Sequence, residues 1–143
     1  MSEQPPETPT WIRRHYSASP YEVQVGFCRA LRAGGRILVS GTAPIDADGT
    51  NVGVGEPYTQ ARRCLEIIRD SLRALGGQLS DVVRTRVYLT RPGDWHAVGR
   101  AHGEVFGSVR PVTTFVVVAG LVDPEWLVEL EAEALVDTGT SRR

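Results

Sequence analysis

The 143-residue chain, with 41% hydrophobic residues, is long enough for a domain that buries a core of its own. Its formal net charge of −1, with both signs interspersed, provides no basic patch for a nucleic-acid partner. Cys28 and Cys64 form no metal-type pair, and no apolar run approaches the ~20 residues of a membrane span. We therefore expect a soluble, cytoplasmic protein that binds neither nucleic acid nor membrane.

The two ends of the chain differ in composition from its middle. Prolines and polar residues dominate the N-terminal end, and the C-terminal end is polar with two final arginines. Such segments bury too little apolar surface to order themselves. We expect flexible tails over residues 1–15 and 138–143, and a single domain over residues 16–137.

The domain begins with a predicted β-hairpin. Two apolar-rich runs, residues 21–33 and 36–42, flank Gly34 and Gly35, a pair that suits a tight turn. Residues 43–57 are rich in glycine, proline and aspartate, which predicts a long loop.

Two amphipathic helices are predicted farther along the chain. Apolar residues recur every three or four positions over residues 58–75, and this helix is expected to begin near Pro57 and end at Gly76. A second helix is expected to be capped by Asp94 and to close at Gly107. Its apolar side includes Trp95, Val98, His102 and Val105.

Three further strands complete the predicted order. Residues 82–90 alternate apolar side chains with arginines, and residues 112–118 form a β-branched run. Residues 128–136 alternate apolar side chains with Glu129, Glu131 and Glu133, so this acidic strand could pair with the cationic one. The order ββαβαββ predicts an α+β fold with one mixed sheet and both helices on one face.

The other face of that sheet is predicted to lack a helical cover. A face of this kind is either simply hydrated or lines a site or a subunit interface. Because it combines carboxylates and arginines with several apolar residues, we expect a homo-oligomer to cover it.

Five motifs in order carry a resemblance to a known family: V-S-G-T-A-P (39–44), Q-A-R-R-C-L-E-I-I (60–68), D-V-V-R-T-R-V-Y-L-T (81–90), R-P-V-T-T (110–114) and L-V-E-L-E-A (127–132). Over residues 26–136 the chain resembles the Rid family, also called YjgF. The resemblance implies a chorismate-mutase-like fold and a homotrimer with small-molecule ligand sites in the clefts between subunits. Well-known members hydrolyse reactive enamines and imines to 2-oxo acids and ammonia without a metal or other cofactor.

The resemblance also assigns site residues. The family's water-activating glutamate falls on Glu129, its ligand-contacting glycine on Gly41, and a pocket aromatic on Phe27, where active deaminases carry tyrosine. A carboxylate beside a water is what imine hydrolysis requires, because the reaction needs one proton acceptor.

The chain departs from the deaminase pattern at one position. Active deaminases carry P-A-R-S where this chain has P-V-T-T, so Thr113 replaces the arginine that clamps the substrate carboxylate. A hydroxyl brings no charge, so we do not expect the usual 2-imino acid deaminase activity. Arg29, which alternation places on the strand face of Phe27, or Arg110 could replace the clamp, and Arg29 is the better candidate.

Three functions remain open. The first is a hydrolase or deaminase acting on an enamine, imine or related reactive metabolite, and the second is a non-catalytic trimeric module that binds a metabolite. A ribonuclease or translation inhibitor is disfavoured by the balanced charge. Four other conspicuous residues are expected to be structural: His102 and Cys28 as buried side chains, and Trp95 and Trp126 as packing residues.

Overall fold

The computed structural model describes residues 7, 9–17 and 19–139. Within these residues, six strands form one sheet in the order β1-β2-β3-β6-β4-β5. The strands are β1 (Ile12–His15), β2 (Ala30–Ala33), β3 (Arg36–Thr42), β4 (Val82–Leu89), β5 (Val112–Val117) and β6 (Val128–Leu135). The helices are α1 (Pro20–Val25), α2 (Pro57–Ala74) and α3 (Trp95–Phe106), with short 3-10 turns η1 (Leu79–Asp81) and η2 (Pro92–Asp94).

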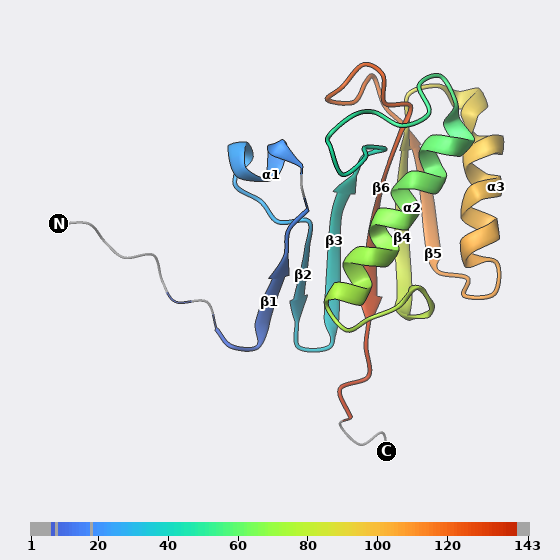
Figure 1. Cartoon of the computed structure of the whole chain (residues 1–143). Helices are drawn as coiled ribbons and strands as arrows, with labels where there is room; N and C mark the ends of the chain where they lie inside the picture. Colours follow the sequence, from blue (N-terminus) through green and yellow to red (C-terminus); the bar gives the residue numbers. More distant parts are fainter. Residues whose placement is uncertain (1–6, 8, 18, 140–143) are drawn as a thin grey trace.

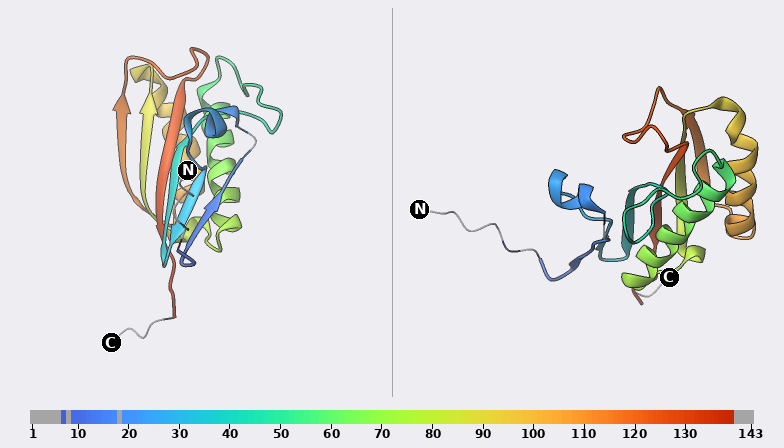
Figure 2. Two further views of the ribbon diagram at one scale, coloured as in Figure 1. Left: turned by 90° about the vertical axis from the view of Figure 1, so that its left-hand side faces the viewer. Right: turned by 45° about the horizontal axis from the view of Figure 1, so that its top comes forward.

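Both long helices lie on one face of the sheet, as predicted (Figures 1 and 2). Helix α2 packs on β3 and β6 and runs beside α3. Its apolar stripe, which includes Leu65, Ile68 and Leu72, is buried against Ile37 and Leu130 of the sheet. Each such side chain contributes about 1.5–3 kcal/mol when fully buried, so this layer forms the core.

The acidic strand β6 lies at the centre of the sheet, antiparallel to both β3 and β4. Strands β4 and β5 are parallel and are joined through α3, since parallel neighbours need a crossover connection. On the face away from the helices, Arg86 of β4 donates a hydrogen bond to Glu131 of β6, and the Tyr88 hydroxyl donates to the same carboxylate at 2.8 Å. The predicted pairing of the cationic and acidic strands is confirmed.

The region before β2 differs from the predicted hairpin. Residues Pro20–Val25 form helix α1, and only Ala30–Ala33 are extended. Proline suits the first turn of a helix, and Gly26, at φ +87°, ends it in the left-handed conformation. The prediction of one continuous strand over residues 21–33 is therefore wrong.

The N-terminal end also differs from the prediction. Residues Ile12–His15, placed in the flexible tail, form the edge strand β1 and pair antiparallel with β2. The element order is therefore β1-α1-β2-β3-α2-β4-α3-β5-β6. The remaining tail predictions, for residues 1–6, 8 and 140–143, lie outside the described residues.

Both long helices have the predicted limits, but the start of α3 differs in detail. The Asp94 carboxylate makes no cap hydrogen bond and instead accepts two from Arg91, at 2.8 and 3.1 Å. Trp95 is 52% exposed, so its predicted packing role is wrong. Its ring lies beside that of His96, tilted by 38°, with centroids 4.2 Å apart. None of the described helices has the length and apolarity that a membrane crossing requires.

Candidate functional site

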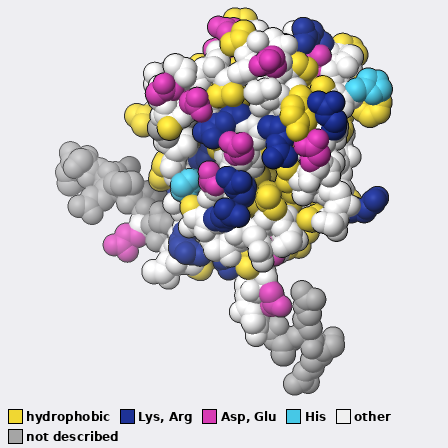
Figure 3. All heavy atoms as spheres, turned by 45° about the vertical axis from the view of Figure 1, so that its right-hand side comes forward, with side chains coloured by type: hydrophobic (Ala, Val, Ile, Leu, Met, Phe, Trp, Pro, Cys, Tyr) yellow, Lys and Arg dark blue, Asp and Glu magenta, His cyan; other side chains and the backbone are white. Residues whose placement is uncertain are grey.

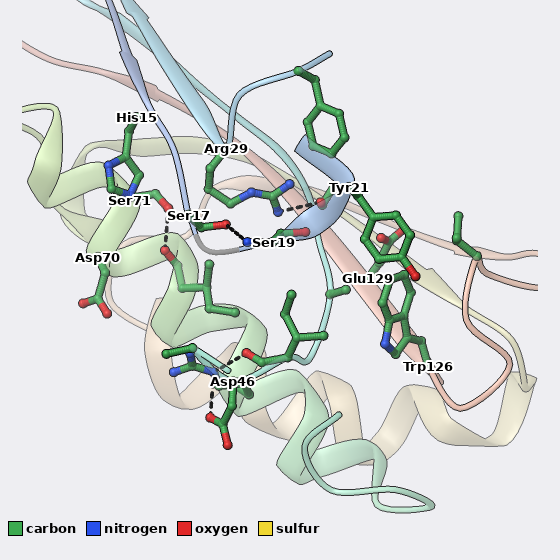
Figure 4. Close-up of a pocket in the computed structure, with 18 of the residues that line it drawn as sticks. His15, Ser17, Ser19, Tyr21, Arg29, Asp46, Asp70, Ser71, Trp126 and Glu129 are labelled. Atoms are coloured by element: carbon green, nitrogen blue, oxygen red, sulfur yellow. Dashed lines mark hydrogen bonds and ion pairs between the residues drawn. The ribbon is translucent and has the colours of Figure 1, made fainter. Parts of the chain in front are cut away.

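A cavity of about 410 Å³ opens beside the end of β3 (Figure 4). Its walls come from four parts of the chain: the segment between β1 and β2, the end of β3 with the loop that follows, helix α2, and the segment that leads into β6. Four of the five residues assigned to the site from sequence line this cavity, namely Phe27, Arg29, Gly41 and Glu129.

The Glu129 carboxylate stands beside Gly41. A Cβ atom added to Gly41 would lie 3.6 Å from Glu129 Oε2, so the missing side chain leaves room next to the carboxylate. The pairing of β3 with β6 changes register between Val39 and Thr42, the stretch that contains this glycine.

The environment of Glu129 raises its pKa above the ordinary carboxyl value. Burial is the largest cause, the nearby Glu131 adds to it, and the positive charge of Arg29 opposes both. A carboxylate with a raised pKa takes up a proton more readily near neutral pH, which suits a general base.

Arg29 is buried and bound to its own chain. Its Nη1 donates hydrogen bonds to the Gly41 carbonyl oxygen at 2.8 Å and to Thr42 Oγ1 at 3.2 Å. Its Nε lies 3.7 Å from Glu22 Oε2 and makes no hydrogen bond within the described structure. Burial lowers the pKa of the guanidinium, although Glu22 and Glu129 oppose this shift. The Phe27 ring lies 5.7 Å from the Arg29 Cζ atom and covers one side of the group.

Glu22 is the partner of Arg29 that the sequence analysis missed. Its side chain is only 2% exposed and accepts hydrogen bonds from the Ser17 backbone N–H, at 2.8 Å, and from the Ser17 hydroxyl. This network ties α1 to the residue that precedes β2. The burial of Glu22 could not be inferred from the sequence, because the helix that carries this charged residue was not predicted.

Two aromatic residues of the cavity were also missed as site residues. The rings of Tyr21 and Trp126 meet edge to face, with centroids 5.8 Å apart. Trp126 is buried, as predicted, and its Nε1–H donates to Asn51 Oδ1 at 2.8 Å. Tyr21 could have been noticed as a hydroxyl-bearing aromatic six residues before Phe27.

Thr113 and Arg110 do not line this cavity. The Thr113 hydroxyl lies 2.7 Å from Thr85 Oγ1 and donates to the Pro111 carbonyl oxygen at 3.2 Å. Thr85 Oγ1 in turn lies 2.8 Å from His102 Nε2, so His102 is hydrogen-bonded as predicted, although it is half-buried and not part of the buried core. Arg110 is exposed in the turn before β5, with φ of +57°.

The two cysteines are free and lie outside the cavity lining. Cys64 is buried in α2, and this burial raises the pKa of its thiol, which keeps it protonated. Cys28 is half-buried, although it was predicted to be a buried, inert thiol. Among the described residues, no group of three or more His, Cys, Asp or Glu side chains is placed to hold a metal ion.

Residues 18–136 match the protein-family model described as Endoribonuclease L-PSP, which represents the YjgF/Rid proteins. The chain belongs to the Rid family. It is 35% identical over 107 residues to the 3-aminoacrylate deaminase RutC of Acinetobacter baylyi, a match that covers 75% of this chain and 84% of RutC. A second relative is an uncharacterized protein of Streptomyces coelicolor, 44% identical over 123 residues, or 86% of this chain and 91% of that protein.

A solved structure of the Rid family shares the fold. The crystal structure of Rv2704 from Mycobacterium tuberculosis, a member of the YjgF/YER057c/UK114 family, is similar with a TM-score of 0.80 and 39% identity. The match covers 87% of this chain and 99% of that one. The predicted Rid-like α+β fold is therefore confirmed.

Proposed function

We propose that this Rid-family chain is a cofactor-free hydrolase of the deaminase type, which acts on an enamine, an imine or a related reactive metabolite. The observation that carries the proposal is the half-buried Glu129 carboxylate, with its raised pKa, beside the open space at Gly41. The relative RutC is named as a deaminase of 3-aminoacrylate, which is an enamine. The likeness to RutC supports the same class of reaction here.

The proposed reaction uses Glu129 twice. The carboxylate takes a proton from a water while the water oxygen bonds to the imine carbon, and the carbon–nitrogen double bond becomes single. The protonated Glu129 then gives its proton to the nitrogen, which completes a neutral carbinolamine. Glu129 next takes the carbinolamine hydroxyl proton and passes it to the amino nitrogen, so the carbonyl forms, the remaining carbon–nitrogen bond breaks and ammonia leaves. The Glu129 carboxyl, with its raised pKa, is the single group that accepts and donates the protons in these steps.

The proposed assembly is a homotrimer in which the helix-free face of the sheet is covered and the cavity lies at a cleft between subunits. Leu38, Val112 and Leu135 on this face are 38%, 61% and 57% exposed in the single chain. Such apolar side chains favour a subunit contact. The free cysteines agree with the cytoplasmic location that we propose.

A non-catalytic trimeric module that binds a small metabolite is the second candidate. It is favoured by one observation: Arg29 is committed to its own chain, and Thr113 brings no charge, so the usual substrate clamp is lacking. A ribonuclease is less favoured, because basic and acidic side chains are interspersed over the face shown in Figure 3.

The test compares Glu129→Gln with Glu104→Gln, which changes an exposed acid of α3 that lies outside the cavity and away from the helix-free face. An oxidase generates imines from a set of amines and amino acids, and the rate of imine loss is followed by trapping. We expect the native protein to accelerate hydrolysis of at least one imine, Glu129→Gln to lose about 100- to 10,000-fold, and Glu104→Gln to remain active. If no imine is hydrolysed faster while its carbonyl product binds in calorimetry, the binding module replaces the enzyme.

A further inference from the structure

The charged side chains that line the cavity have a net negative balance. Among the described lining residues, two cations, Arg29 and Arg63, stand against three carboxylates, Asp46, Asp70 and Glu129. Asp46 pairs with Arg63 at 3.7 Å, and Asp70 pairs with Arg69 at 3.2 Å. Arg29 faces Glu22 at 3.7 Å, so Glu129 is the lining carboxylate that no ion pair neutralises among the described residues. A negatively charged wall lowers the affinity for an anionic ligand and raises it for a cationic one.

Both arginines that line the cavity already make hydrogen bonds and ion pairs within the protein. Arg29 donates to backbone and threonine oxygens and faces the buried Glu22. The Arg63 Nε donates to the Ile45 carbonyl oxygen at 2.8 Å, and its Nη1 lies 3.2 Å from Glu66 Oε2. Neither guanidinium can clamp a substrate carboxylate without giving up a contact it has.

The uncharged part of the lining is largely aromatic and aliphatic. Phe27, Tyr21 and Trp126 contribute rings, and Ile45 and Ile67 contribute branched side chains. A dry apolar cavity of about 150 Å³ holds a benzene molecule, so a cavity of about 410 Å³ has room for a ring and a reactive group beside it. Aromatic faces also attract cations, by about 0.5–2 kcal/mol each.

We infer that the substrate is an enamine or imine that carries an aromatic or other bulky apolar group in the place where a 2-imino acid carries its carboxylate. The inference rests on the proposed function and narrows it. An imine that takes up a proton becomes a cationic iminium ion, which suits walls that are aromatic and negatively charged. This substrate class differs from that of RutC, because 3-aminoacrylate bears a carboxylate.

One member of this class, suited to a test, is the imine of phenylacetaldehyde. Its iminium ion and one water give phenylacetaldehyde and an ammonium ion. The water oxygen bonds to the imine carbon while Glu129 holds the water proton, the carbon–nitrogen bond breaks after that proton reaches nitrogen, and the hydroxyl proton leaves with ammonia. No oxidant or other co-reactant is consumed.

The first experiment measures ligand charge preference without turnover. Calorimetry of the native protein compares 2-phenylethylammonium with phenylacetate, which share a ring and differ in the sign of their charge. We expect the cation to bind at least tenfold more tightly, and Ile67→Trp, which fills the cavity, to remove this binding. Ala74→Trp adds the same ring at an exposed position of α2 and should leave binding unchanged. If Ile67→Trp does not fold, Ile67→Phe replaces it.

The second experiment compares turnover. An amine oxidase generates the imine of phenylacetaldehyde from 2-phenylethylamine, and an amino acid oxidase generates 2-iminopropanoate from alanine. We expect kcat/KM for the aromatic imine to exceed that for 2-iminopropanoate at least tenfold. Equal or faster turnover of 2-iminopropanoate, or tighter binding of phenylacetate, overturns the inference while leaving the hydrolase intact. If the protein accelerates the hydrolysis of no imine, the proposed function fails. The preference for the cation in calorimetry then still decides the ligand class.

Discussion

Replacing Arg29 with methionine tests whether this residue holds the site together or serves as a ligand clamp. The change removes a guanidinium that is 6% exposed and leaves the buried Glu22 carboxylate without its counter-charge. It also removes the donor to the Gly41 carbonyl oxygen. Breaking one side of a buried ion pair costs about 3–5 kcal/mol, so we expect Tm to fall by about 10–15 °C.

The assay is thermal and urea unfolding of four proteins at one fixed protein concentration: native, Arg29→Met, Glu22→Gln and the double variant. Because the double variant removes both buried charges, it should regain part of the lost stability, with a coupling free energy of about 0.5–3 kcal/mol. Arg100→Met is the matched control, since Arg100 lies 4.0 Å from Glu104 on the exposed side of α3, away from the sheet face that the proposed trimer covers. That change should cost less than about 1 kcal/mol.

The reasoning is refuted if Arg29→Met unfolds within about 1 kcal/mol of the native protein, or if the double variant is no more stable than the single one. Either result means that Glu22 does not hold Arg29 in place. Arg29 would then be free to bind a substrate carboxylate, as the sequence suggested.

Three further predictions concern the site and the assembly. Because burial raises the pKa of Glu129 in the folded chain, its protonated form is favoured there, and this stabilisation is lost as pH rises through the folded pKa. Thermal melts should therefore show Glu129→Gln gaining stability relative to the native protein as pH rises above the ordinary carboxyl pKa, and a relative loss contradicts this. Gly41→Ala should melt normally, since its Cβ makes an ordinary 3.6 Å contact, but lose hydrolysis because the methyl group takes the space beside the carboxylate. Light scattering should give about three times the 15.6 kDa chain mass, and a monomer would contradict the proposed trimer.

Elements with strong local signals were predicted well. Helix α2 has an apolar stripe bounded by Pro57 and Gly76, and strand β6 alternates apolar and acidic residues over its length. Helix α1 was missed because a six-residue helix is stabilised by tertiary contacts, here between Glu22 and Arg29, more than by its own pattern. Strand β1 was missed because backbone pairing with β2 forms it, and its side chains show no apolar alternation.

The site could be predicted only in part. The resemblance to the Rid family assigned Phe27, Gly41 and Glu129 to one site, and they line one cavity. Alternation along an extended strand added Arg29, although the residues before Ala30 are not part of β2. The sequence could not show that Arg29 pairs with a carboxylate of its own chain, because Glu22 comes from a separate helix and approaches Arg29 to 3.7 Å.

The contacts among Arg86, Tyr88 and Glu131 have a consequence for how copies of the chain would associate. These charged and polar groups satisfy one another within a single chain, on the face that the proposed trimer covers. Covering the face then requires few ion pairs between subunits, and the attraction comes mainly from apolar side chains. Dissolved salt screens exposed charges but strengthens or leaves unchanged the burial of apolar surface. The assembly should accordingly hold together in high salt, where complexes that depend on opposite charges come apart.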